Sequence, residues 1–118
     1  MSAKILVVDD EEDLRELFIM HLESEGLPCI QAECGDAAWD IFQNNNISLI
    51  ITDYHMPKGN GIELLEKVRE INKDIPLILL LTDASPEDVE KAKQLDISSI
   101  VAKPFDLEDV TAQVKKIL

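Results

Sequence analysis

The six residues from Lys4 to Asp9 read Lys-Ile-Leu-Val-Val-Asp, a short β-branched run that ends in an acid. A run of this kind is typical of a strand that is buried on both faces of a parallel sheet. The same pattern returns from Ser48 to Asp53, which reads Ser-Leu-Ile-Ile-Thr-Asp. We therefore expect both segments to be strands of one parallel sheet.

Strand patterns alternate with helical patterns along the rest of the chain. The other expected strands are Pro28–Ala32, Leu77–Thr82 and Ser98–Ala102. The expected helices are Glu12–Glu25, Asp36–Asn45, one that follows the Pro57–Gly61 loop and ends near Ile71, Glu87–Gln94, and Asp106–Leu118. Five strand–helix units in alternation predict an α/β fold, doubly wound, with a parallel sheet, right-handed crossovers and helices on both faces.

Apolar residues at helical spacing predict the buried side of the first helix. Leu14, Leu17, Phe18 and Leu22 stand at positions i, i+3, i+4 and i+8. His21 falls on the same side, and we interpret it as a half-buried structural histidine.

The segment Ser85-Pro86-Glu87-Asp88 has the pattern of a helix start. Ser85 can cap the helix, Pro86 suits the first helical position, and Asp88 lies three residues after the cap. The acidic residues Glu87, Asp88 and Glu90 are interpreted as a solvated face of this helix.

Length and charge limit the classes of function. The 118 residues fit one domain, residues 1–118, and 46% of them are hydrophobic, which excludes a disordered acidic tail. The net charge of −13, without a cluster of Lys and Arg, argues against direct binding to nucleic acid or to an anionic membrane and favours a monomer. Cys29 and Cys34 lack metal or redox spacing, so we expect reduced thiols in a cytoplasmic protein.

Polar residues stand where the expected strands end. Asp9 and Asp10 follow the first strand, Asp53 ends the third, Thr82 ends the fourth, and Lys103 follows the fifth. The ends of parallel strands gather at one edge of the sheet, where doubly wound folds bind their ligands. The topology thus predicts three carboxylates, a hydroxyl and an ammonium group in one place.

Such a cluster has chemical consequences. Two like charges about 4 Å apart repel by about 4 kcal/mol at an effective dielectric constant near 20. Lys103 compensates one charge, and the remaining excess favours a divalent cation with oxygen ligands, Mg²⁺ or alternatively Mn²⁺ or Ca²⁺. An aspartate can attack phosphorus to form an aspartyl phosphate, with the metal and the lysine stabilising the developing charge.

The sequence resembles the receiver domain of bacterial two-component response regulators, the CheY-like family. The matching segments, in family order, are Val7–Asp10, Ile51–Gly61, Leu81–Thr82 and Ala102–Phe105. The resemblance implies a flavodoxin-like sheet of five strands in the order 2-1-3-4-5 with five helices. It also implies phosphorelay signalling, with catalysis limited to the domain's own phosphorylation and dephosphorylation.

The resemblance also implies a phosphorylation site. Asp53 would accept the phosphoryl group from a phosphohistidine on a sensor histidine kinase or a phosphotransfer protein. Mg²⁺ would be held by Asp9, Asp10, Asp53 and the backbone carbonyl of His55. Lys103 would pair with Asp53 and then with the phosphoryl group.

A switch is implied as well. Thr82 would move to bond the phosphoryl oxygen, and the Lys103–Pro104 peptide bond would be cis. The change would alter a protein-binding surface on the fourth helix, fifth strand and fifth helix. The downstream protein is unknown, and the chain is either complete or a part of a longer protein.

Three residues depart from the family pattern or modulate it. Ile100 stands where many members carry Tyr or Phe, so the aromatic reporter of the switch is absent. Asp83 follows Thr82 where Ala or Gly is usual, and it either slows phosphorylation and alters metal hydration or points to water. His55 either borders the phosphoryl group and influences hydrolysis or is an exposed loop histidine.

The sequence leaves two alternative functions open. The first is a degenerate receiver that binds partners without being phosphorylated, which Asp83 and Ile100 motivate. The second is an aspartate-nucleophile phosphatase of the haloacid dehalogenase kind. That class places a second Asp two residues after the nucleophile, where this chain has His55.

Overall fold

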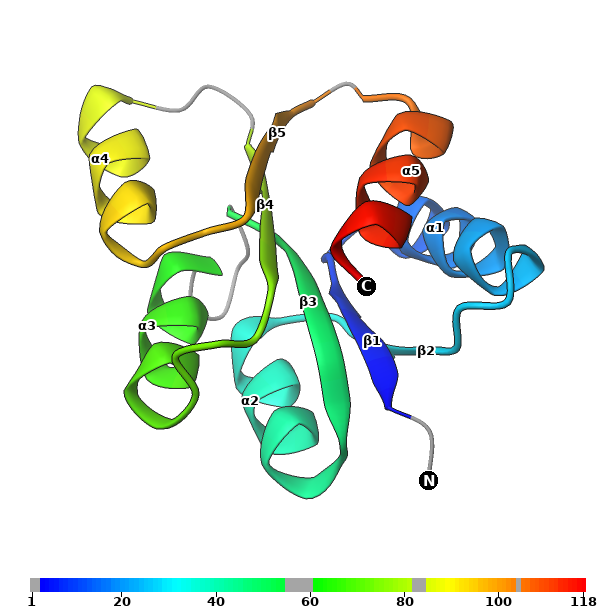
Figure 1. Ribbon diagram of the computed structural model, residues 1–118, viewed down its shortest axis with the longest axis horizontal. Helices are drawn as coiled ribbons and strands as arrows, with labels where there is room; N and C mark the ends of the chain where they lie inside the picture. Colours follow the sequence, from blue (N-terminus) through cyan, green and yellow to red (C-terminus); the bar gives the residue numbers. More distant parts are fainter. Residues whose placement is uncertain (1–2, 55–60, 82–84, 104) are drawn as a thin grey trace.

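The computed structural model describes residues 3–54, 61–81, 85–103 and 105–118. These residues form five parallel strands in the order β2-β1-β3-β4-β5 and five helices, as expected (Figure 1). The strands are β1 (Lys4–Val8), β2 (Cys29–Ala32), β3 (Ile47–Asp53), β4 (Leu77–Leu81) and β5 (Ser99–Ala102). The helices are α1 (Glu12–Ser24), α2 (Gly35–Asn44), α3 (Gly61–Ile71), α4 (Pro86–Gln94) and α5 (Leu107–Ile117).

Helices cover both faces of the sheet. In Figure 1, α1 and α5 lie on one side of the strands, and α2, α3 and α4 lie on the other. Strand residues alternate between the two cores: Ile5 and Val7 pack with the α1 and α5 side, whereas Leu6 and Val8 pack with the other. Strands β1, β3 and β4 are therefore buried on both faces, which explains their continuous apolar runs.

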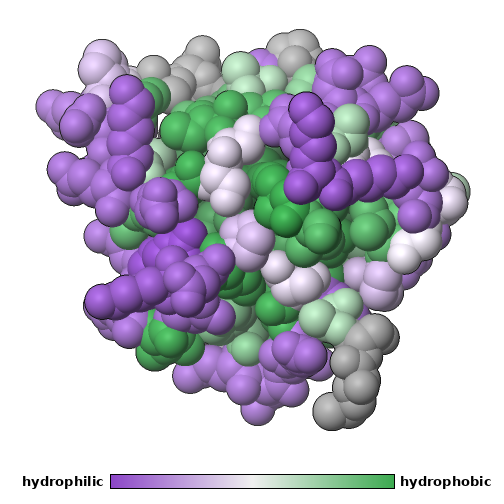
Figure 2. Space-filling model, viewed as in Figure 1, coloured by the Kyte–Doolittle hydropathy of each residue, from purple (hydrophilic) through white to green (hydrophobic). Residues whose placement is uncertain are grey.

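Hydrophilic and hydrophobic residues are separated on one face of the molecule (Figure 2). Figure 2 shows hydrophilic side chains around the periphery of one face and hydrophobic residues gathered in its middle. Among the described residues, no helix is long and apolar enough to cross a membrane. Cys29 and Cys34 are both free thiols, as expected.

The prediction for the buried side of α1 was wrong at Leu17. This side chain is 54% exposed, whereas Phe18 and Leu22 are buried and Leu14 is half-buried. Adjacent helical residues point about 100° apart, and on α1 Phe18 points to the core while Leu17 points to its exposed flank. The i, i+4, i+8 series from Leu14 faces the core, and His21 is half-buried beside it.

Helix α4 begins as its sequence predicts. The Ser85 hydroxyl accepts the Asp88 backbone N–H over 3.1 Å, and the Asp88 carboxylate accepts the Ser85 backbone N–H over 3.3 Å. Pro86 occupies the first turn. The interpretation of Asp88 as part of a solvated face was wrong, because Asp88 is only partly exposed and its carboxylate binds the hydroxyl of Tyr54.

Candidate functional site

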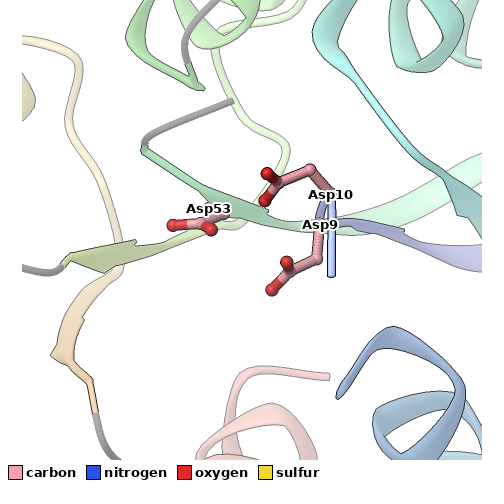
Figure 3. Close-up of side chains that lie close together, drawn as sticks. All are labelled: Asp9, Asp10 and Asp53. Atoms are coloured by element: carbon pink, nitrogen blue, oxygen red, sulfur yellow. The ribbon is translucent and has the colours of Figure 1, made fainter. Parts of the chain in front are cut away.

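Three carboxylates meet at the carboxyl edge of the sheet. Asp9 and Asp10 follow β1, and Asp53 is the last residue of β3 (Figure 3). One oxygen from each carboxylate lies within 4.8 Å of the others. Asp9 and Asp53 are buried, with 1% and 4% of their surfaces exposed, whereas Asp10 is exposed. Adjacent parallel strands produce this arrangement, since Val8 of β1 pairs in register with Thr52 of β3.

A single ammonium group joins two of these carboxylates. Lys103 follows β5, and its Nζ lies 2.9 Å from Oδ2 of Asp53 and 3.3 Å from Oδ2 of Asp9. The Lys103 backbone N–H donates to the Leu81 carbonyl over 2.8 Å, which fixes the chain beyond β5 to the end of β4. The predicted meeting of Asp9, Asp10, Asp53 and Lys103 is confirmed in the geometry.

Burial, hydrogen bonds and neighbouring charges shift the pKa values of Asp9 and Lys103. Burial raises the pKa of Asp9, and the nearby charge of Asp53 raises it further, whereas the Glu11 N–H bond and Lys103 only partly compensate. Burial lowers the pKa of Lys103, but hydrogen bonds and charges from Asp53 and Asp9 outweigh it, so the pKa of this ammonium is raised. Lys103 therefore remains a cation, and the pocket keeps an excess of negative charge.

Neighbouring groups fix the backbone around Asp9. Arg15 on α1 donates from Nη1 to the Asp9 carbonyl over 2.7 Å and from Nε to Oε1 of Gln31 over 2.7 Å. The Glu11 N–H donates to Oδ1 of Asp9 over 2.9 Å. Sequence reasoning missed Arg15, because its helical position carries no motif that points to the carbonyl of Asp9.

The end of β3 is held equally closely. The Tyr54 N–H donates to the Leu80 carbonyl over 2.9 Å, and the Gly61 N–H donates to the Tyr54 carbonyl over 2.9 Å. A Cβ atom at Gly61 would lie 2.3 Å from the Asp53 carbonyl oxygen. Only glycine permits this approach of α3 to β3, so Gly61 helps to place Asp53.

Several predicted site residues lie outside the described residues. They are His55, Thr82, Asp83 and Pro104. The roles of His55 as carbonyl ligand and modulator, of Thr82 as switch and of Asp83 as modulator therefore remain predictions, and so does the cis peptide bond before Pro104. Ile100 is described and is 37% exposed on β5. The neighbouring Val101 packs toward α1 and α5, so Ile100 lies on the opposite face of the sheet.

The donor set suits a hard divalent cation. Carboxylate oxygens are the ligands that Mg²⁺ prefers, and zinc would favour nitrogen or sulfur ligands. Asp9, Asp10 and Asp53 offer three such oxygens within reach of one another. The residues present therefore fit Mg²⁺.

The chain matches one protein family over most of its length. Residues 5–115 match the model of the response regulator receiver domain. The transcriptional regulatory protein SrrA of Staphylococcus aureus is 32% identical over 118 residues, which are 100% of this chain and 48% of SrrA. The chain thus spans about half the length of the curated relatives it matches.

Solved structures resemble this fold along nearly the whole chain. The chemotaxis response regulator CheY4 of Vibrio cholerae has a TM-score of 0.90, with 29% identity and 100% of each chain covered. A CheY-like receiver domain protein from Methanospirillum hungatei has a TM-score of 0.92, with 26% identity, and the similarity covers 98% of this chain and 93% of the other.

Proposed function

This chain belongs to the response regulator receiver domain family, a family of phosphorelay signalling modules, and we propose that the Asp53 carboxylate is its phosphoryl acceptor. The observation that carries the proposal is the contact between Asp53 and Lys103 beside two further carboxylates. Residues 1–118 would act as one receiver unit, with no catalysis beyond self-phosphorylation and self-dephosphorylation.

The reaction follows from the charges at the site. An oxygen of Asp53 attacks the phosphorus of a phosphohistidine, an O–P bond forms, and the P–N bond to the imidazole breaks. The freed imidazole nitrogen keeps the electron pair of the broken bond. Lys103 already contacts Asp53 and can follow the new phosphoryl oxygens, so its charge stabilises the transition state more than the ground state.

Asp9, Asp10 and Asp53 would hold Mg²⁺, with the carbonyl of His55 as a further predicted ligand. Mn²⁺ or Ca²⁺ would fit the same donors in vitro. The bound ion supplies positive charge that offsets the approaching phosphoryl oxygens. Arg15 contributes by fixing the peptide of Asp9, so that the carboxylates remain in place when the charge at the site changes.

The phosphoryl donor is proposed to be a sensor histidine kinase or a phosphotransfer protein. Phosphorylation replaces a charge near −1 with one near −2. Thr82 and Lys103 would then gain contacts that bias the loop after β4 and a protein-binding surface on α4, β5 and α5. The cytoplasmic location, the monomeric state and the absence of direct contact with nucleic acid or membranes stay predictions.

Intact-mass spectrometry tests this function. The protein is incubated with acetyl phosphate or phosphoramidate, with and without Mg²⁺, beside the Asp53→Asn variant. We expect the wild-type protein to gain one phosphoryl group only with Mg²⁺ and the variant to gain none. A folded wild-type protein that gains none from either donor would indicate a degenerate receiver. Turnover of simple phosphate esters would instead indicate a phosphatase.

A further inference from the structure

The side chain of Tyr54 connects the phosphorylation site to α4. Tyr54 directly follows Asp53, and its backbone is fixed on both sides by Leu80 and Gly61. Its hydroxyl donates to Oδ1 of Asp88 over 2.5 Å, across 34 residues of sequence. A hydrogen bond of this length between a phenol and a carboxylate belongs to the strong, charge-assisted class.

Asp88 transmits this contact to the beginning of α4. Its second oxygen, Oδ2, accepts the backbone N–H of Ser85, and its own N–H is bound by the Ser85 hydroxyl. The Asp88 carboxylate therefore closes the capping box with one oxygen and binds the Tyr54 hydroxyl with the other. The first turn of α4 is thus bound, through Asp88, to the residue that directly follows Asp53.

The surroundings of the hydroxyl agree with this geometry. Tyr54 and Asp88 are both half-buried, and Tyr54 packs against the core below α3 and α4. The bond to Asp88, together with burial and the charges of Asp88 and Glu63, raises the pKa of Tyr54 to about 12. The donor role of the phenol follows from the geometry, because its partner is a carboxylate oxygen, which accepts hydrogen bonds.

We propose that Tyr54 is a positioning residue that holds the first turn of α4 against the end of β3, through Asp88, until Asp53 is phosphorylated. The inference rests on the proposed function of Asp53. It assigns to Tyr54 a coupling role in a chain that has Ile100, and no aromatic ring, on β5. A phosphoryl group on Asp53 that shifts the adjacent Tyr54 would break its hydrogen bond to Asp88 and release the first turn of α4.

Tyr54 is the only tyrosine in the sequence, so one label reports on it. The protein is labelled with tyrosine carrying ¹³C at Cζ, and the single resonance is recorded before and after phosphorylation by acetyl phosphate and Mg²⁺. The Asp88→Ala variant gives the chemical shift of the Tyr54 Cζ atom when the phenol lacks this hydrogen-bond partner. The Ser85→Ala variant weakens the cap but leaves Asp88, and it controls for loss of capping alone.

We expect the wild-type resonance to differ from that of Asp88→Ala and to move toward it on phosphorylation, whereas Ser85→Ala stays close to the wild type. Tyr54→Phe keeps the ring and loses the bond, so it should accept the phosphoryl group faster, by about tenfold for a hydrogen bond to a charged group. The Glu87→Gln variant, on the exposed side of the same turn, should retain the wild-type rate.

Two results of the phosphorylation experiments would overturn the inference while leaving the proposed function intact. One is a phosphorylated protein, verified by mass, whose tyrosine resonance has not moved. The other is a wild-type rate of phosphorylation in Tyr54→Phe. A resonance that is equal in the wild type and Asp88→Ala overturns the inference without any phosphorylation. A protein that gains no phosphoryl group contradicts the proposed function and, with it, the coupling.

Discussion

The Nζ atom of Lys103 donates to Oδ2 of Asp53 over 2.9 Å, although fifty residues separate the two along the chain. The Asp53 side chain is buried, with 6% of its surface exposed, and the Lys103 side chain is partly buried, with 13% exposed. The ammonium also reaches Asp9, so a single cation compensates two buried carboxylates. This relationship makes the stability of the fold and the chemistry of the site depend on the same charges.

Replacing Lys103 by Met should destabilise the protein strongly. The variant leaves Asp9 and Asp53 buried without their cation, and breaking a buried pair in this way costs about 3 kcal/mol. Urea unfolding near neutral pH measures the change. The control is Lys115→Met, which breaks the exposed pair with Glu25 and should change the free energy of unfolding by less than about 0.5 kcal/mol. Equal losses of unfolding free energy in the two variants would show that Lys103 does not compensate the charges of Asp9 and Asp53.

The raised pKa of Asp9 should make stability decrease as the pH rises. The folded state binds the proton more tightly than the unfolded state, so this carboxylate destabilises the fold increasingly from about its ordinary value of 3.8 upward. The cost is complete above the folded pKa. Without Mg²⁺, Asp9→Asn should thus be more stable than the wild type near neutral pH and show a flatter pH dependence. The control is Asp40→Asn, on the exposed surface of α2. Its free energy of unfolding, measured with urea, should depend on pH as that of the wild type does.

Mg²⁺ should stabilise the folded chain through the carboxylate cluster. At a hundredfold excess over its dissociation constant, a ligand of the folded state alone adds about 2.7 kcal/mol. Thermal unfolding over a Mg²⁺ titration measures this gain. Asp10→Asn should lose most of it, whereas Asp13→Asn, exposed in the first turn of α1, should keep it. A gain that survives in Asp10→Asn would place the ion elsewhere.

Gly61→Ala should disturb the site through the backbone of Asp53. The new Cβ would meet the Asp53 carbonyl oxygen at 2.3 Å, and relief of such an overlap costs about 3 kcal/mol. Phosphorylation of Asp53 should slow at the same time. Gly26→Ala is the control: its φ of +80° costs about 1 kcal/mol, but nothing lies within 4 Å of its Cβ. Urea unfolding and the rate of phosphorylation distinguish the two effects.

The meeting of Asp9, Asp53 and Lys103 could be predicted from the sequence because it needs only topology. Once the strands are known to be parallel, their ends must share one edge. The capping box of Ser85 and Asp88 was predictable for a similar reason, since its partners lie three residues apart and the pattern is local.

Other contacts could not be predicted, because they depend on packing between distant segments. The spacing of apolar residues in α1 was compatible with burial of both Leu17 and Phe18. Only the packing of the helix against the sheet shows that Phe18 is buried and Leu17 is exposed. The bond between Tyr54 and Asp88 joins a strand end to a helix 34 residues away, with no motif to indicate it. The close approach of Gly61 to Asp53 likewise appears only when α3 packs against β3.

Identifying the residue that carries the phosphoryl group tests most directly whether Asp53 is the acceptor. The protein is phosphorylated with acetyl phosphate and Mg²⁺, reduced with borohydride to convert an aspartyl phosphate into homoserine, and mapped by peptide mass spectrometry. We expect homoserine at position 53 and at no other aspartate. Homoserine at Asp9, Asp10 or another position, with Asp53 unchanged, would contradict this expectation.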